Sequence, residues 1–250
     1  MMLNSTVLST SRLSPNVKKL DFEWNVDVEP GQFIMIWSPG IGEIPMSVSH
    51  LGNPKSITVK SYGIVSSRIM ELAPGEMIYF RGPFGNSFDI RKGKKLLIGG
   101  GSGMASLHPL IGPGVHGLVA GRTSSDLLFS EEFEKDKVTL ATDDGSVGIR
   151  GTAVDALRTI DVDQFDSVYV CGPELMMYGV MKELGKYSAF VQFSLERNMK
   201  CGIGVCDSCS IDGFQLCTQG PVFEMETVKN MREFGKERLN ISGRRIKYNL

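Results

Sequence analysis

The stretch Lys95-Leu96-Leu97-Ile98-Gly99-Gly100-Gly101-Ser102-Gly103 marks the point at which the pattern of the chain changes. Its first four residues form a short apolar run typical of a buried strand, and a weakly helical stretch follows the glycines. A glycine-rich turn between a strand and a helix lets backbone N–H groups face a pyrophosphate. The match to G-x-G-x-x-G is imperfect, because Met104 takes the place of the third glycine in one register. Taken alone, the stretch therefore fits a plain tight turn as well as a nucleotide site.

Beyond this point, strands alternate with helices. Further strands are predicted at 117–120, 138–141, 167–170 and 190–194, and helices at 154–160 and 174–184. This alternation predicts a parallel, doubly wound α/β sheet, in which ligands bind at the carboxyl ends of the strands. Cys171-Gly172-Pro173 lies at such an end. It can also be an ordinary strand–helix connection, with Cys171 acting as a small buried apolar residue.

The chain before this point consists of short strands separated by turns. Strands are predicted at 17–24, 32–37, 45–49 and 56–60, a helix at 64–72, and a closing loop at 81–86. Short strands at this spacing predict a small β-barrel. We therefore expect a barrel domain over residues 1–90, an α/β domain over 91–195, and a cysteine-containing segment with a polar tail over 196–250.

Four of the five cysteines lie close together near the C-terminus. Their spacing is Cys201-x4-Cys206-x2-Cys209-x7-Cys217. The first three match the plant-type [2Fe–2S] run, C-x4-C-x2-C followed by a later cysteine. Three thiolates on one tight loop reach two irons from one side, a distant fourth closes the other side, and Gly202 and Gly204 suit such a loop. The alternative is a structural zinc site, but such sites more often pair two C-x2-C knuckles or combine cysteines with histidines.

The bulk composition limits the class of protein. A chain of 250 residues suggests two domains, and 42% apolar with 22% charged residues is ordinary for a globular protein. The formal charge of −1 creates no field that would attract nucleic acid or anionic lipid. The sequence has neither a run of 18 apolar residues nor the pattern of a secretory signal. We therefore expect a cytoplasmic protein whose clustered cysteines bind metal rather than form disulfides.

The order of these features resembles the ferredoxin–NADP reductase superfamily, and more closely the electron-transfer subunits of NAD-dependent dihydroorotate dehydrogenases. The resemblance covers essentially the whole chain. It rests on PGQF (30–33), IPMSV (44–48), GPFG (82–85), DDGSVG (143–148), SLERNMKCGIG (194–204) and GPVF (220–223). The cysteine segment is its most specific part.

The resemblance implies sites for FAD, NAD and a [2Fe–2S] cluster. The implied FAD residues are Pro45, Met46, Ser47 and Val48 on a barrel strand, with Gly63, Ser66 and Ser67 at the start of the barrel helix. The implied NAD residues are Gly100, Gly101, Gly103, Cys171, Gly172 and Pro173, and the implied metal ligands are Cys201, Cys206, Cys209 and Cys217. Two departures stand out: Ile44 replaces a family arginine that contacts the FAD diphosphate, and the last cysteine interval is short. The serines of the barrel helix can alternatively serve only to cap it.

The same resemblance implies a function. The chain would take electrons from a partner catalytic subunit that contains FMN, in a heterotetramer, and pass them through [2Fe–2S] and FAD to NAD. It needs no catalytic acid–base pair of its own. Glu196 can approach the flavin or the nicotinamide, or merely cap a loop, and Arg122 leaves NAD and NADP open. The alternatives are a flavin and iron–sulfur subunit of a hydrogenase or of a ferredoxin–NAD(P) oxidoreductase, and a zinc-stabilised binding module without redox chemistry.

Overall fold

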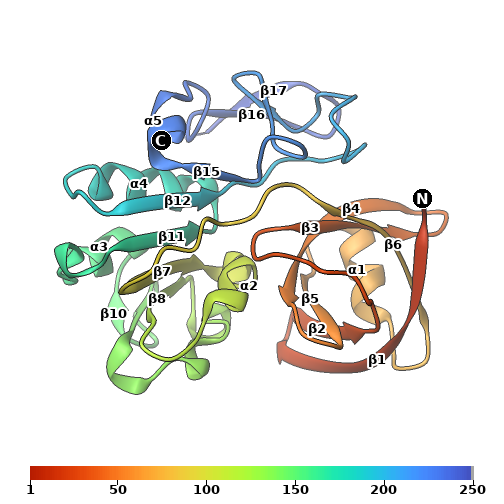
Figure 1. The fold of residues 1–250 in the computed structure, drawn as a ribbon, viewed down its shortest axis with the longest axis horizontal. Helices are drawn as coiled ribbons and strands as arrows, with labels where there is room; N and C mark the ends of the chain where they lie inside the picture. Colours follow the sequence, from red (N-terminus) through yellow and green to blue (C-terminus); the bar gives the residue numbers. More distant parts are fainter. Residues whose placement is uncertain (249–250) are drawn as a thin grey trace.

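A computed structural model of the protein describes residues 1–248. A β-barrel and an α/β unit lie side by side, and the C-terminal segment runs along one edge of both (Figure 1). This arrangement confirms the fold class expected from the sequence.

The barrel is closed and antiparallel, with strand order β1-β2-β5-β4-β3-β6. Its strands are β1 (Leu3–Ser14), β2 (Val17–Phe22), β3 (Phe33–Ser38), β4 (Gly42–His50), β5 (Lys55–Lys60) and β6 (Met77–Phe84). Alternation along β2 shows why these residues form a barrel wall: Leu20 and Phe22 are fully buried, whereas Lys19 before them and Asp21 between them are only partly buried. Because β1 pairs with both β2 and β6, the barrel is closed and has no open edge strand.

The loop expected at 81–86 is wrong for its first four residues, because β6 continues to Phe84. Gly82 and Pro83 suggested the end of a strand. They lie instead within β6, where its pairing register with β3 shifts between Phe33 and Met35. A register irregularity of this kind tolerates a proline and a glycine with φ of +145°. The other main difference in the barrel is β1, for which the sequence analysis predicted no strand.

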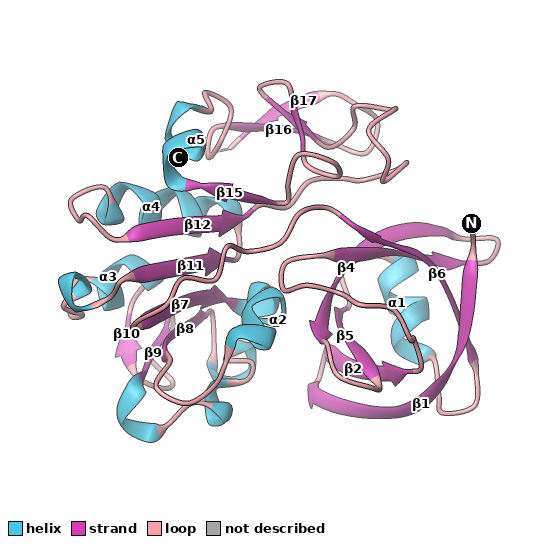
Figure 2. Cartoon of the chain, in the orientation of Figure 1, coloured by secondary structure: helices cyan, strands magenta, loops and turns pink. Residues whose placement is uncertain are grey.

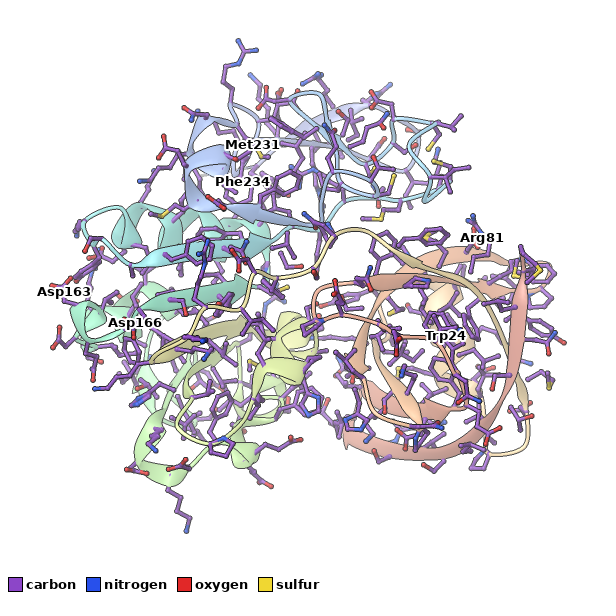
Figure 3. The ribbon with its side chains drawn as sticks, viewed as in Figure 1. Trp24, Arg81, Asp163, Asp166, Met231 and Phe234 are labelled. Atoms are coloured by element: carbon purple, nitrogen blue, oxygen red, sulfur yellow. The ribbon has the colours of Figure 1, made fainter. Side chains whose placement is uncertain are left out.

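Helix α1 (Ile64–Glu71) packs on the barrel and confirms the helix expected there. It buries Ile69 and Met70 against the barrel core. Trp24 and Phe80 meet edge to face inside the barrel, with ring centroids 5.0 Å apart. Figure 3 labels Trp24 within the barrel wall.

The α/β sheet has the order β10-β9-β8-β7-β11-β12-β15. Its strands are β7 (Lys95–Gly100), β8 (His116–Gly121), β9 (Val138–Thr142), β10 (Ile149–Arg150), β11 (Ser167–Cys171), β12 (Phe190–Ser194) and β15 (Val222–Glu224). All neighbours pair in parallel except β12 and β15, which are antiparallel. The strand order reverses between β7 and β11, which creates the crevice where doubly wound sheets bind ligands.

The helices of this unit are α2 (Met104–Leu107), α3 (Ala153–Leu157) and α4 (Glu174–Leu184). α2 is short and lies between two 3-10 turns, since Pro109 cannot continue the helical hydrogen bonding. Thr152 caps α3 by accepting a hydrogen bond from the Asp155 amide. α4 packs Met177, Val180 and Leu184 into the core of the sheet.

The C-terminal segment is mostly loop, as Figure 2 shows. It contains the hairpin β13 (Ser210–Ile211) with β14 (Phe214–Gln215), helix α5 (Met225–Asn230), and the hairpin β16 (Glu237–Leu239) with β17 (Arg245–Lys247). The tail is not polar throughout, because Val228, Met231 and Phe234 are buried in the core of the α/β unit, whereas residues 241–247 are exposed. Figure 3 labels Met231 and Phe234 in this position. Among residues 1–248, no helix has the length and apolar character needed to cross a membrane.

Candidate functional site

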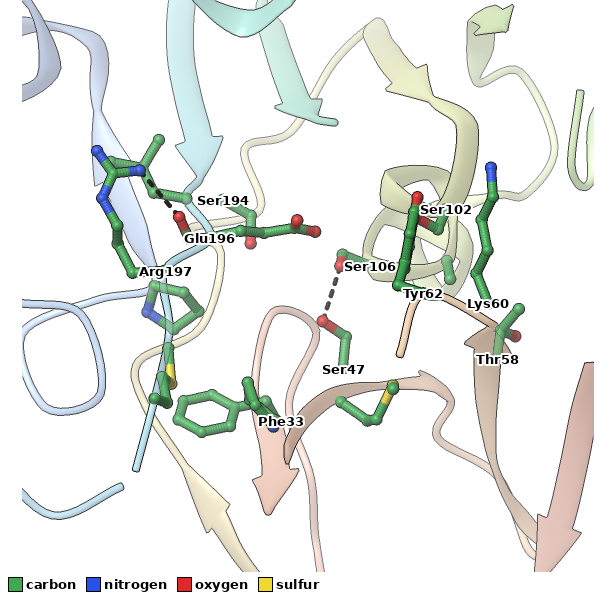
Figure 4. A pocket seen from close by; sticks show the side chains of 16 residues that line it. Phe33, Ser47, Thr58, Lys60, Tyr62, Ser102, Ser106, Ser194, Glu196 and Arg197 are labelled. Atoms are coloured by element: carbon green, nitrogen blue, oxygen red, sulfur yellow. Dashed lines mark hydrogen bonds between the residues drawn. The ribbon is translucent and has the colours of Figure 1, made fainter. Parts of the chain in front are cut away.

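A cavity of about 210 Å³ lies where the barrel meets the α/β unit. β4 supplies Pro45, Met46 and Ser47 to its wall. In Figure 4, Glu196 reaches in from one side, opposite Tyr62 and Ser102, and Phe33 lies below. Three of the four strand residues predicted for FAD thus line one cavity. The fourth, Val48, is 1% exposed and points into the barrel core instead.

Two polar groups give this cavity its chemistry. The Ser47 and Ser106 hydroxyls hydrogen-bond across the junction at 2.7 Å, which ties β4 to α2 (Figure 4). Glu196 is exposed at the cavity wall, and desolvation by the neighbouring protein raises the pKa of its carboxyl group.

A larger groove of about 760 Å³ continues from this cavity along the carboxyl ends of the strands. Its lining includes Gly100, Gly101 and Pro173 from the predicted nucleotide residues, as well as Arg122. Tyr62 borders both spaces, so the two are neighbours. A dinucleotide needs such an extended space beside a glycine turn.

The remaining predicted nucleotide residues shape the groove without lining it. A Cβ atom on Gly103 would lie 2.5 Å from the Cα of Gly172, so the two turns touch only because both residues are glycine. Cys171 is completely buried, and burial, aided by the charge of Glu196, raises the pKa of its thiol to about 12. Cys171 is therefore a neutral packing residue under physiological conditions.

The start of α1 uses its serines locally. The Ser66 hydroxyl accepts hydrogen bonds from the amides of Tyr62 and Gly63, and the Ser67 hydroxyl bonds to Ser61. The Ser66 and Ser67 side chains therefore serve the start of the helix itself, which is the capping alternative given in the sequence analysis. Gly63 contributes no side chain at the N-cap, which leaves the helix start open.

Lys60, at the end of β5, is a groove residue that the sequence reasoning missed. Its Nζ lies 2.7 Å from Oδ1 of Asp126 and 5.5 Å from the centre of the Tyr62 ring. It borders both spaces and places a positive charge beside the glycine turn. The signal was a polar run, 60–62, at the end of a predicted strand.

The four clustered cysteines lie near one another on the loop. Cys206 affects the pKa of Cys201, and burial together with both Cys209 and Cys201 raises the pKa of Cys217. Within residues 1–248, no three cysteine, histidine or acidic side chains converge closely enough to hold a single ion. The spacing fits a [2Fe–2S] cluster, which the four thiolates would hold, whereas zinc sites more often pair two C-x2-C knuckles or combine cysteines with histidines.

Backbone amides surround these sulfurs. Ile203 and Val205 donate to Cys201 at 3.5 and 3.4 Å, and Gly204 donates to Cys217 at 3.2 Å. Gly202 and Gly204 have φ of +72° and +76°, which turns the amides toward the sulfurs. Burial alone raises the pKa of Cys201, but hydrogen bonds from these amides and from Cys206 outweigh it and lower the pKa to about 6. Cys201 thus favours thiolate, the form that binds iron, whereas burial and the neighbouring Cys209 raise the pKa of Cys217 to about 12.

Comparison with known proteins identifies the family. Residues 196–229 match the model of the iron–sulfur cluster binding domain of dihydroorotate dehydrogenase B. A protein of Thermoplasma volcanium is 50% identical over 249 residues, with 100% of both chains covered. It is described as the probable electron transfer subunit of dihydroorotate dehydrogenase B (NAD(+)). This chain belongs to the family of dihydroorotate dehydrogenase B electron transfer subunits.

Other relatives agree with this family. A Methanothermobacter thermautotrophicus protein with the same description is 40% identical, covering 93% of this chain and 92% of its own. A solved structure of an NADH-dependent reduced ferredoxin–NADP oxidoreductase has a TM-score of 0.79 at 25% identity, over 89% of this chain and 88% of that one. The FAD/NAD-binding domain of a Vibrio cholerae nitric oxide dioxygenase, at 21% identity and a TM-score of 0.65, shares the fold over 75% of this chain and 98% of its own.

Proposed function

We propose that the protein passes electrons from an FMN-containing dihydroorotate dehydrogenase subunit, through a [2Fe–2S] cluster and FAD, to NAD⁺. The cysteine loop is the observation that carries this proposal: its four cysteines have the [2Fe–2S] spacing, and backbone amides donate to the sulfurs of Cys201 and Cys217. When bound, the cluster would carry one electron at a time, and the flavin would combine two electrons and a proton into the hydride that NAD⁺ accepts. The chain's own residues bind and orient these groups.

Each cofactor has a proposed place. Pro45, Met46 and Ser47 line the wall against which the flavin would lie. The glycine turn and Pro173 border the groove proposed for NAD⁺. The Cys171-Gly172 turn fixes the floor of that groove through its contact with Gly103. Glu196 lines the cavity that adjoins the groove proposed for NAD⁺.

The cluster loop also offers a route to the partner. Cys206 is exposed, and Ile203 and Val205 are 55% and 76% exposed, whereas Cys209 and Cys217 are buried. One side of the cluster thus faces outward and the other faces the protein. We propose that the catalytic subunit docks on the outward side, in a heterotetramer. Thiolate ligands also suit a reducing compartment, so we place the complex in the cytoplasm.

The proposal is tested by co-expressing the chain with the catalytic subunit. The complex should reduce NAD⁺ with dihydroorotate and contain two irons per copy of this chain. Cys206→Ser should abolish the visible absorption of the cluster and the electron flow, while FAD content stays near wild type. Cys171→Ser is the matched control. Because Cys171 lies apart from the cluster loop, this variant should keep the iron of the cluster. Full cluster absorption in Cys206→Ser would contradict the ligand set.

A second candidate function has support from one observation. The likeness to the ferredoxin–NADP oxidoreductase chain also fits a subunit that exchanges electrons with ferredoxin or a hydrogenase. The same preparation separates the two functions. NAD⁺ reduction that depends on ferredoxin, with none from dihydroorotate when the catalytic subunit is present, would favour the second candidate.

A further inference from the structure

An ion pair on the barrel wall touches the first cysteine of the cluster loop. Arg81 on β6 and Glu43 on β4 form a two-pronged pair, with Nε to Oε1 at 2.8 Å and Nη2 to Oε2 at 2.6 Å. β3 separates the two strands, so the pair spans it. The side chains are 21% and 19% exposed. Figure 3 labels Arg81 at the barrel edge that faces the C-terminal segment.

The remaining guanidinium nitrogen reaches the cluster loop. Nη1 of Arg81 donates a hydrogen bond of 3.0 Å to the carbonyl oxygen of Cys201, 120 residues away in sequence. The next residue, Gly202, lies so close to the barrel that a Cβ atom there would be 3.1 Å from Cγ of Met35. The guanidinium also lies 5.5 Å from the centre of the Phe84 ring. The loop is therefore seated on the barrel wall and tied there by Arg81.

The orientation of the pair gives it an electrostatic role. Arg81 contacts the loop, and Glu43 holds the opposite edge of the guanidinium. A cluster with four thiolate ligands becomes more negative when reduced, so a nearby positive charge stabilises the reduced form and a negative charge opposes it. Partial burial reduces solvent screening of both charges. The pair as a whole is neutral, but each member acts on the cluster with opposite sign.

We propose that Arg81 and Glu43 are positioning residues for electron transfer: Arg81 seats the cluster loop on the barrel and raises the reduction potential of the cluster, and Glu43 holds Arg81 in place and offsets its charge. This inference rests on the proposed [2Fe–2S] cluster. It concerns a residue pair outside the cysteine loop, on the barrel wall rather than on the loop itself.

The test is a redox titration of the complete complex, followed by electron paramagnetic resonance of the reduced cluster. Glu43→Gln removes a negative charge and leaves the hydrogen bond to Cys201 possible, so the midpoint potential should rise. Arg81→Gln should lower it, and the double variant should return toward the wild-type value. Arg68→Gln and Glu71→Gln, which split an exposed pair on α1, are matched controls and should leave the potential unchanged.

Two results would overturn the inference. The first is a wild-type potential and resonance signal in both single variants at full iron content, and the second is a shift of both in the same direction. If Arg81→Gln does not retain iron, Arg81→Lys, which keeps the charge, and Glu43→Gln still decide the matter: Arg81→Lys must keep a potential near wild type and Glu43→Gln must raise it. Absence of iron from the wild-type complex would instead refute the cluster itself.

Discussion

The buried pair of Glu174 and Arg197 should be the ionic contact most costly to break. Glu174 opens α4, and its carboxylate accepts hydrogen bonds from Arg197, from the Gly235 amide at 2.7 Å and from the Tyr248 hydroxyl at 3.0 Å. The Arg197 and Glu174 side chains are only 3% and 7% exposed. The pair thus joins the start of α4, the end of the β12 segment and the C-terminal hairpin.

Glu174→Ala removes the carboxylate and leaves the Arg197 guanidinium buried without a counter-charge. Breaking a buried ion pair in this way costs about 3–5 kcal/mol. For a chain of this size, 1 kcal/mol corresponds to roughly 2–4 °C, so the melting temperature should fall by roughly 6–20 °C. The assay is urea unfolding and thermal melting followed by circular dichroism, with the cofactors bound.

The control is Glu71→Ala, which breaks the exposed pair with Arg68 and should leave the melting curve unchanged. Replacing both buried partners with methionine should recover much of the loss, because no buried charge then remains unpaired. The reasoning is refuted if Glu174→Ala melts like Glu71→Ala, or if the double replacement is less stable than Glu174→Ala alone.

Three further predictions concern the site and the barrel. Gly103→Ala should cost about 1–3 kcal/mol of folding stability, because the added methyl group would overpack against Gly172. It should also raise the KM for NAD⁺ and leave the iron content unchanged. A variant that melts and reacts like wild type would count against the close contact. Cys171, whose pKa burial raises to about 12, should resist iodoacetamide at about pH 8.5 in the native protein and react after unfolding, as mass spectrometry would detect. Burial alone would raise the pKa of Asp21, but hydrogen bonds from two serines and the charge of Lys19 lower it overall. Asp21 therefore stabilises the barrel above its ordinary pKa and loses this effect as the pH falls through its lowered folded pKa. Asp21→Asn should destabilise at pH 7 and approach wild type as the pH falls through that pKa, and a difference that does not change with pH would oppose this interpretation.

The elements that the sequence predicted well are those with a local signal. The strands of the α/β unit are short apolar runs, and α4 shows helical periodicity, so both can be recognised from neighbouring residues. The cysteine spacing predicted the cluster loop for a similar reason: residues 201–209 form one local loop, and Gly202 and Gly204 have the positive φ that this loop requires.

The elements that were missed depend on distant partners. β6 runs through Gly82 and Pro83 because the register shift of β3 accommodates them, and no local pattern reveals that shift. Val222–Glu224 becomes an edge strand only because β12 is available to pair with it. In the site, the hydroxyls of Ser66 and Ser67 turn inward to neighbouring groups, and Lys60 meets Asp126 from the other unit. Sequence spacing identifies candidate residues but not the direction in which their side chains point.

The path of the chain around the cysteines determines which part of the fold depends on the metal. It leaves the sheet after Ser194 and re-enters it at Val222, and these two residues are directly paired. The amide of Leu195 also bonds to the carbonyl of Pro221 at 2.8 Å, so the excursion is closed at its base. The cysteine loop therefore lies outside the hydrogen-bonded ladder of the sheet, although Cys209 and Cys217 pack in the core beside it. We expect loss of the metal to loosen the packing around Ile211 and Leu216 while the pairing of β12 with β15 stays intact.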